Sequence, residues 1–198
     1  MYTDYKPLPM FPLNFGASYF EPRQELPARI KLTDPAVLAM TDLRQVSAVT
    51  VEANTPLDKA LQRMTDGGVK LLLVVNAQYT VIGLITATDI QGEKPLTFLN
   101  EVNVRYGEIL VRDIMTPQEK LEVLRYEDVL RARTGDIVAT LKAAGSQHAL
   151  VMDMDVQERR HSVRGIFSAA QLGRQLGTPV YTDETLNCFA ALRSAVAG

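Results

Sequence analysis

The sequence has few of the residues that usually bind metals or form disulfides. It contains one cysteine, Cys188, and only two histidines. An internal disulfide is therefore impossible, and we expect no metal site, because structural zinc sites are built from about four such ligands. A lone cysteine is typical of a reducing compartment, so the prediction for localisation is cytoplasmic.

Long apolar runs and an excess of one charge are also missing. The longest apolar stretches, such as LLLVV at 71–75, are far too short to span a bilayer. The N-terminus lacks the basic and apolar segments of a secretory signal. The formal net charge is −2, so no basic field attracts nucleic acid or anionic lipid. We therefore expect no membrane association and no nucleic-acid partner.

Recognisable catalytic motifs are absent as well. No serine or cysteine stands in a nucleophile motif with a candidate base, and no glycine-rich loop of the phosphate-binding type occurs. The sequence therefore predicts a protein that is not an enzyme and has no catalytic cofactor.

What the sequence does contain is a duplicated pattern. After an extended stretch at 46–53, a helix is predicted over 55–68, with Thr55 at its N-cap and Pro56 at its first position. Two apolar strands follow at 69–75 and 80–86, and a second helix is expected to begin near Asp89.

The same order of elements recurs later in the chain. A helix is predicted at 134–145, strands at 148–153 and 162–168, and a closing helix at 169–177. Two copies of one unit of this kind argue for repeats that share a core, since neither copy is large enough to be stable alone. The basic segment 157–164 between the second pair of strands is expected to be a solvated turn or a contact surface.

The rest of the chain divides around these repeats. Leu96, Leu99 and Val102 have helical spacing and are expected to pack over the module. The predicted domains are an arm rich in proline and aromatic residues at 1–39, which either lies over the body or is a tail, repeat one at 40–93, a connecting helix at 94–110, repeat two at 111–177 and a C-terminal helix at 178–198.

Short motifs mark corresponding points of the two repeats. GLITATDI at 83–90 has a counterpart in GIFSAAQL at 165–172, and VRDIMTP at 111–117 has a weaker echo in AMTDLRQV at 39–46. Together with TPLDKAL at 55–61, these motifs resemble a tandem pair of cystathionine-β-synthase (CBS) domains, often called a Bateman module. The resemblance implies an α+β fold, in which each repeat is a small sheet with packed helices and a pseudo-twofold axis relates the two. It also implies a homodimer.

The end of the GLITATDI motif is suited to an adenosine ligand. A strand that leads into a helix N-terminus presents backbone N–H groups to an anion, and the Thr86 or Thr88 hydroxyl could add a donor to a phosphate. The Asp89 carboxylate is a natural acceptor for the two hydroxyls of a ribose. The resemblance implies these roles for Thr86 and Asp89. The alternative is that Asp89 only caps the following helix.

The second copy departs from this pattern. Ser168 keeps a hydroxyl, but Gln171 stands where the first repeat has its aspartate, so the cleft of repeat two is expected to bind an adenosine ligand weakly or not at all. Alternatively, Gln171 merely covers a helix surface.

Further ligand contacts follow from the resemblance alone. It places the adenine against Thr50, Val51, Thr55 and Pro56 in repeat one. Basic groups that could approach the phosphates are Lys70, His148 and Arg133, each of which could instead be a solvated edge residue. His148 could also be a partly buried histidine whose hydrogen bonds are satisfied.

The resulting hypothesis is a regulatory module that senses an adenosine ligand through repeat one and signals to an unknown protein partner. The candidate ligands are AMP, ADP, ATP and S-adenosylmethionine. The alternative is a structural dimerisation or docking protein whose nucleotide clefts are vestigial.

Overall fold

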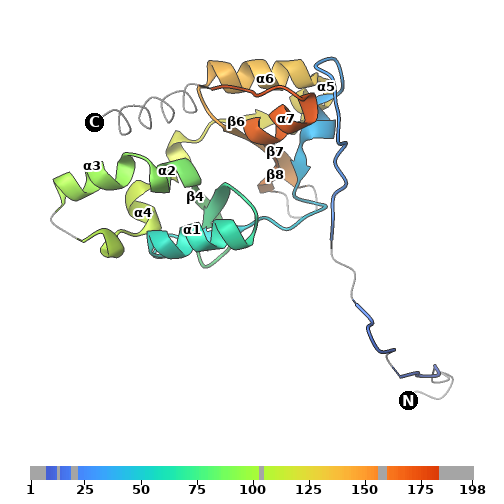
Figure 1. Cartoon of the computed structure of the whole chain (residues 1–198), viewed down its shortest axis with the longest axis horizontal. Helices are drawn as coiled ribbons and strands as arrows, with labels where there is room; N and C mark the ends of the chain where they lie inside the picture. The colour runs from blue at the N-terminus through green and yellow to red at the C-terminus, as the bar shows by residue number, and fades with distance from the viewer. Residues whose placement is uncertain (1–7, 13, 19–21, 103–104, 156–159, 183–198) are drawn as a thin grey trace.

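The computed structural model describes residues 8–12, 14–18, 22–102, 105–155 and 160–182, and these form two similar α+β halves side by side (Figure 1). The first repeat consists of β2 (Thr50–Glu52), α1 (Leu57–Asp66), β3 (Leu71–Val75), β4 (Val81–Thr86) and α2 (Ala87–Gln91). The second consists of β6 (Val123–Arg125), α5 (Tyr126–Arg131), α6 (Thr134–Ala143), β7 (His148–Asp155), β8 (Arg160–Ser168) and α7 (Ala169–Leu176). The predicted fold class is confirmed.

The helices and hairpins follow the sequence pattern closely. Helix α1 buries Leu57, Ala60 and Met64 at helical spacing. It begins one residue later than predicted, because Pro56 and not Thr55 is its N-cap. Gly177 ends α7 in the left-handed conformation with φ of 72°, as expected of a glycine helix stop.

Each half contains a four-stranded sheet, with strand orders β2-β3-β4-β5 and β1-β8-β7-β6, where β1 is Thr41–Asp42 and β5 is Thr116–Pro117. Strand β3 is buried along its whole length. Its Leu72 and Val74 pack into the core under the helices, whereas Leu71 and Leu73 join Leu84 and Leu150 between the two sheets. This two-sided burial explains why the strand is a continuous apolar run.

The two halves exchange short strands. Strand β1 (Thr41–Asp42) lies at the start of the first repeat but pairs antiparallel with β8 of the second. Strand β5 (Thr116–Pro117) lies near the start of the second repeat but pairs antiparallel with β4 of the first. Each half therefore completes the sheet of the other, which ties the two repeats into one body.

Two methionine–glycine contacts explain the motifs that mark these crossings. A Cβ at Gly83 would lie 2.8 Å from both Met115 Sδ and the Thr116 carbonyl oxygen. A Cβ at Gly165 would lie 2.4 Å from Met40 Sδ. The glycine of each strand motif is thus required because the methionine of a crossing segment packs directly on the backbone.

The connection between the repeats is mostly helical. It contains α3 (Lys94–Glu101), a 3-10 turn η2 (Tyr106–Glu108), α4 (Val111–Ile114) and a second turn η3 (Gln118–Lys120). The prediction that Leu96 and Val102 pack over the module is wrong, since they are 61% and 40% exposed. The third predicted residue, Leu99, contacts the first core as expected, and its neighbour Phe98 does so too.

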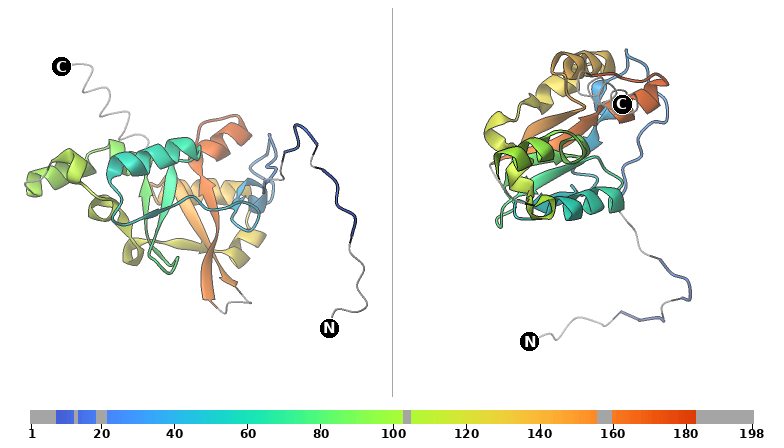
Figure 2. Two further views of the ribbon diagram at one scale, coloured as in Figure 1. Left: turned by 90° about the horizontal axis from the view of Figure 1, so that it is seen from below. Right: turned by 60° about the vertical axis from the view of Figure 1, so that its left-hand side comes forward.

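The N-terminal arm divides into an exposed and a packed part. Leu8, Met10, Phe11 and Phe15 are all more than 80% exposed, and this part of the chain projects away from the body (Figure 2). The following segment packs on the second repeat, where Ile30 and the short 3-10 helix η1 (Ala36–Ala39) belong to its core.

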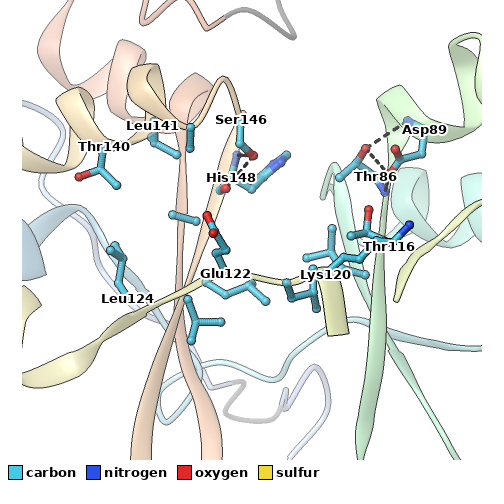
Figure 3. Close-up of a pocket in the computed structure, with 16 residues that line it drawn as sticks. Thr86, Asp89, Thr116, Lys120, Glu122, Leu124, Thr140, Leu141, Ser146 and His148 are labelled. Carbon is cyan, nitrogen blue, oxygen red and sulfur yellow. Dashed lines mark hydrogen bonds between the residues drawn. The ribbon is translucent and has the colours of Figure 1, made fainter. Parts of the chain in front are cut away.

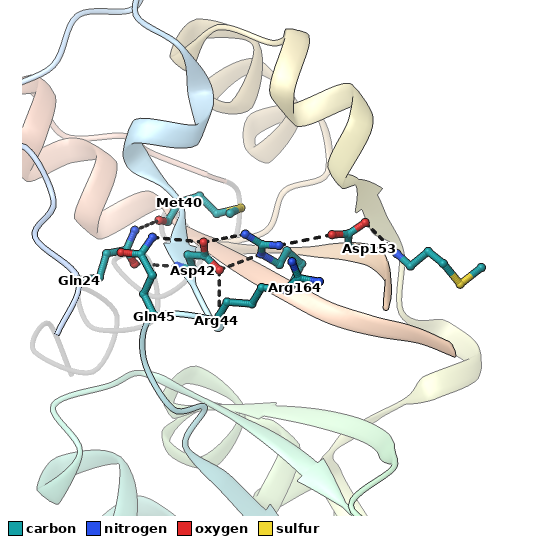
Figure 4. A network of polar contacts seen from close by, with 8 residues as sticks. Gln24, Met40, Asp42, Arg44, Gln45, Asp153 and Arg164 are labelled. Carbon is teal, nitrogen blue, oxygen red and sulfur yellow. Dashed lines mark hydrogen bonds and ion pairs between the residues drawn. The ribbon is translucent and has the colours of Figure 1, made fainter. Parts of the chain in front are cut away.

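A polar network fixes the crossing strand β1 on the second sheet (Figure 4). The Arg164 guanidinium contacts Asp42 Oδ1 at 2.8 Å and Oδ2 at 2.9 Å, and it lies 4.6 Å from the centre of the Tyr126 ring. Gln24 donates to the Met40 carbonyl and accepts from the Asp42 N–H. Arg164, from the segment expected to be a solvated turn, is in fact an internal tether.

Two predictions concern residues that are not described. Residues 183–198, which make up most of the expected C-terminal helix, and residues 156–159 of the basic turn lie outside the described part of the chain. Within that part, no helix has the length and apolar character needed to cross a membrane.

Candidate functional site

A cavity of about 750 Å³ lies between the two repeats (Figure 3). One wall is formed where β4 meets α2, the opposite wall by the end of α6 and the start of β7, and the floor by the chain from β5 to β6. The polar and charged residues that line it are Thr86, Asp89, Thr116, Lys120, Glu122, Thr140, Ser146 and His148.

Thr86 and Asp89 hold each other in a reciprocal capping arrangement at the start of α2. Asp89 Oδ2 accepts from the Thr86 N–H and the Thr86 hydroxyl, both at 2.8 Å, and Thr86 Oγ1 accepts from the Asp89 N–H at 3.1 Å. The Ala87 N–H donates to the Lys70 carbonyl at 2.9 Å. The alternative that Asp89 caps the helix is therefore what the structure shows. Its role at a ribose stays a prediction.

The second oxygen of Asp89 is also engaged. Lys94, the first residue of α3, places its ammonium 2.6 Å from Asp89 Oδ1 and 3.5 Å from the Ile114 carbonyl. The Asp89 side chain is only 11% exposed, whereas that of Lys94 is 48% exposed. The Lys94 side chain can therefore move into solvent and leave the carboxylate to a ligand hydroxyl group. The Asp89 side chain is buried and stays in place.

His148 stands on the wall opposite Asp89 (Figure 3). Burial lowers its pKa from 6.5 to about 4, and the nearby Asp89 carboxylate offsets only part of this shift. The imidazole is consequently neutral near pH 7. The His148 carbonyl accepts a hydrogen bond from the Ser146 hydroxyl at 2.9 Å, which fixes the start of β7.

Several residues that line the cavity were not predicted from the sequence. Thr116 belongs to the VRDIMTP motif. Its place in the cavity could have been predicted if the pairing of this segment with β4 of the first repeat had been considered. Lys120 is the last residue of η3 and Glu122 follows shortly after it, and nothing in their spacing sets them apart from other surface residues. Thr140 looks like an ordinary helix residue.

Six predicted ligand contacts of repeat one do not line this cavity. Thr50 and Val51 lie in β2, where Val51 is buried in the first core. The Thr55 carbonyl accepts from the Val111 N–H, and Pro56 begins α1. The side chain of Lys70 is exposed just before β3. Thr88 also lies outside the lining, and its hydroxyl accepts from Gln147 at 3.4 Å.

The corresponding point of the second repeat is occupied by the chain itself. Gln171 Nε2 donates to the Ala39 carbonyl at 3.0 Å, and its Oε1 accepts from the Thr41 hydroxyl at 3.4 Å. Ser168 precedes α7 without a side-chain cap. The Arg133 N–H donates to Asp136 at the start of α6. Of the predicted contacts, the structure brings together Thr86, Asp89 and His148.

A smaller cavity of about 470 Å³ adjoins the first. The two share Thr116 and Lys120, and Lys94 lines the smaller one. Among the residues that the structure describes, no group of three or more histidine, cysteine, aspartate or glutamate side chains is placed to hold a metal ion.

The chain is similar in sequence to one protein family and in structure to several solved proteins. The family model of the CBS domain matches residues 39–93. An uncharacterized conserved protein from Pyrococcus horikoshii has 22% identity and a TM-score of 0.50, covering 72% of this chain and 92% of its own. CBSX2 in complex with AMP has 20% identity and a TM-score of 0.50, covering 71% of this chain and 93% of its own.

A second structure of CBSX2, described as a CBS-pair protein from Arabidopsis thaliana, has 20% identity and a TM-score of 0.47, covering 73% of this chain and 94% of its own. Comparison with curated proteins returned no match. Residues 39–93 of this chain therefore match the CBS-domain family, and the chain as a whole has the fold of a CBS-domain pair.

Proposed function

We propose that the protein is a non-catalytic regulatory module that binds an adenosine-containing ligand in the cavity beside Asp89 and signals its occupancy to a protein partner. The observation that carries the proposal is the cavity itself. Its volume of about 750 Å³ lies within the range of small-molecule sites, and Thr86, Asp89 and His148 converge on it from the two repeats.

The geometry supports a ribose beside Asp89. Among the described residues, its Oδ1 contacts the ammonium of Lys94, whose side chain is half exposed, so ribose hydroxyls can share or take over that oxygen. Its Oδ2 stays in the capping box, which keeps the carboxylate oriented. The apolar lining from Leu84, Leu124, Leu141 and Leu150 suits the flat face of a base. AMP binding by CBSX2, which shares this fold, supports the same class of ligand.

The position of the cavity supports a regulatory role. Its walls come from both repeats, so a bound ligand contacts Asp89 on one side and the His148 region on the other. A ligand that binds one arrangement of the repeats better than another shifts the population by its differential affinity. We expect this shift to be read by a partner, in the context of a homodimer.

Calorimetric titration of the full chain with adenosine compounds tests the proposal. We expect binding by the wild type and a loss of at least about tenfold in affinity for Asp89→Asn, which keeps an acceptor for the cap but loses the charge. The matched control is Gln171→Ala in the second repeat, which should bind as the wild type does. Absence of binding to every adenosine compound, or unchanged binding in the Asp89 variant, would contradict the proposal.

The second candidate function is a docking protein, and the exposed apolar side chains of the arm favour it. Gln24 is bonded to Met40 and Asp42 of the crossing segment, and Pro27 and Ile30 are bonded to Gln175 of the second repeat, so the informative deletion ends at residue 21. If docking is the main function, this deletion should abolish partner recovery or dimer mass while leaving adenosine binding unchanged.

A further inference from the structure

A lysine of the chain itself contacts the carboxylate oxygen that a ligand hydroxyl would need. Asp89 Oδ2 is fixed in the capping box, and Oδ1 lies 2.6 Å from the Lys94 ammonium. Lys94 does not line the large cavity but reaches Asp89 from the smaller cavity beside it. A hydroxyl that approaches Oδ1 from the large cavity therefore meets an acceptor that already has a charged partner.

Lys94 also connects three elements of the first half. It is the first residue of α3, and its partner Asp89 belongs to α2. Its ammonium lies 3.5 Å from the carbonyl oxygen of Ile114, the last residue of α4. Shortly after Ile114 the chain enters β5, whose Thr116 lines the large cavity. Both contacts of the Lys94 ammonium are therefore with segments that lead into the cavity.

Few buried side chains hold α3 on the body. The helix lies at the outer end of the first half, away from the second repeat, and packs against α2 and α4 (Figure 1). Of its eight residues only Pro95 is buried, and Phe98 and Leu99 are partly buried against the first core. Elements with so few buried apolar contacts open at a low free-energy cost. Loss of the ion pair to Asp89 should therefore loosen the start of α3.

The ion pair is also weak enough for a ligand to displace it. The Lys94 side chain is 48% exposed, so water can solvate its ammonium once it leaves the carboxylate. Exposed ion pairs shift equilibria by factors of only about two to five. Asp89 has a buried side chain and keeps its place in the capping box without the lysine.

We propose that Lys94 is an internal competitor for the Asp89 carboxylate. Without ligand it holds α3 against the body, and a ligand hydroxyl that takes over Oδ1 releases the lysine and loosens the helix. This proposal rests on the proposed function and names the residue through which occupancy of the cavity reaches the surface. The surface element that responds is α3.

Calorimetric titration of the full chain with adenosine tests the competition. Lys94→Met removes the ammonium and keeps a long side chain, so adenosine should bind about two to five times more tightly than to the wild type. The matched control is Lys59→Met, an exposed position of α1 outside the lining of both cavities, which should bind as the wild type does. Unchanged or weaker adenosine binding by Lys94→Met would overturn the proposal.

Two further comparisons locate the effect at the hydroxyl groups. Lys94→Met should bring no gain for 2′,3′-dideoxyadenosine, because this compound has no ribose hydroxyl to compete for Oδ1. Lys94→Arg keeps a cation beside Asp89 and should bind adenosine no more tightly than the wild type. A gain for the dideoxy compound equal to that for adenosine would contradict competition for the carboxylate.

The release of α3 is measured by hydrogen–deuterium exchange with mass spectrometry. Saturating adenosine should speed amide exchange in α3 of the wild type, whereas α1, which does not line the cavity, should not change. In Lys94→Met the exchange of α3 should be fast from the start and insensitive to adenosine. Exchange in wild-type α3 that is unchanged or slowed by adenosine would show that the helix is not released.

The outcomes also separate this proposal from the proposed function. If no adenosine compound binds, the proposed function fails. If adenosine compounds bind through Asp89 but Lys94→Met does not strengthen the binding, the proposed function stands and only the competitor role is wrong.

Discussion

In both repeats the second strand of the hairpin leads directly into a helix, but the surroundings of the two junctions differ. In the first, Thr86 and Asp89 form a closed capping box beside a cavity. In the second, Ser168 has no side-chain cap, and Gln171 binds Ala39 and Thr41 of the crossing segment. The replacement of an aspartate by a glutamine therefore does more than remove a charge, because the longer side chain fixes the chain that crosses over it.

The two crossing strands, β1 and β5, also differ in the contacts that hold them in place. By register, Asp42 opposite Gly165 corresponds to Pro117 opposite Gly83. Asp42 is paired with Arg164, whereas the residue that corresponds to Arg164 beside Gly83 is Ile82. One crossing is held by a buried ion pair and the other by apolar contacts. The comparison suggests that the second half is built for a fixed connection and the first for an accessible site.

The largest effect should come from breaking the ion pair of the second half. Arg164→Ile copies the first half but leaves the buried Asp42 carboxylate unpaired, so we expect a loss of about 3–5 kcal/mol in the free energy of unfolding, measured with urea. The exposed Arg112→Ile should cost less than about 1 kcal/mol. Adding Asp42→Ala to Arg164→Ile should recover most of the loss. A loss in the single variant as small as that in the Arg112 variant would show that the pair does not tether β1.

The next effect is a pH dependence that only the second half should show. His148 pairs with Ser168 in register, whereas Leu71 occupies the matching place opposite Thr86. The folded pKa of His148 is about 4, below the ordinary 6.5, so unfolding takes up a proton between these values. Stability should be complete above pH 6.5 and fall by up to about 3 kcal/mol as the pH drops toward 4.

Two substitutions test the origin of that slope. His148→Leu should flatten the dependence of unfolding free energy on pH between 6.5 and 4. The exposed His161→Gln, which changes the other histidine of the chain, should leave the slope intact. A slope that survives in His148→Leu would assign it to other groups.

A smaller difference is expected between the two strand glycines. Gly83→Ala brings a methyl group against the Thr116 carbonyl oxygen, which belongs to the backbone, and should cost about 1–3 kcal/mol. Gly165→Ala brings its methyl group against both Cγ and Sδ of Met40, which is fully buried, so the whole side chain must shift inside the core and the loss of unfolding free energy should be larger. Chemical denaturation of both variants gives the comparison, and equal losses would contradict it.

The smallest effect concerns the caps. Thr86→Ala removes the hydroxyl that accepts from the Asp89 N–H, so we expect a loss of about 0.5–2 kcal/mol in unfolding free energy. Ser168→Ala removes no side-chain cap and should change stability by less than about 0.5 kcal/mol. Thermal unfolding of the two variants side by side measures the difference, and a larger shift for Ser168→Ala would reverse the comparison.

Much of the fold could be predicted because its signals are local. The buried face of α1, the apolar run of β3 and the glycine stop of α7 each follow from neighbouring residues. The candidate site was predictable only in part. Thr86 and Asp89 share one motif, whereas Lys120, Glu122 and Thr140 reach the cavity from segments whose spacing carries no signal. The adenine contacts expected at Thr50 and Thr55 remain predictions outside this cavity.

The sequence by itself determined the two repeats, their helices and hairpins, and the polar ends of their second strands, because periodicity, caps and turns depend on residues close together in the chain. Only the tertiary structure decided that each repeat lends a strand to the other, that Arg164 binds Asp42, and that Asp89 and His148 lie on opposite walls of one cavity. These contacts join residues far apart in sequence, and their pairing depends on how the packed cores bring the segments together.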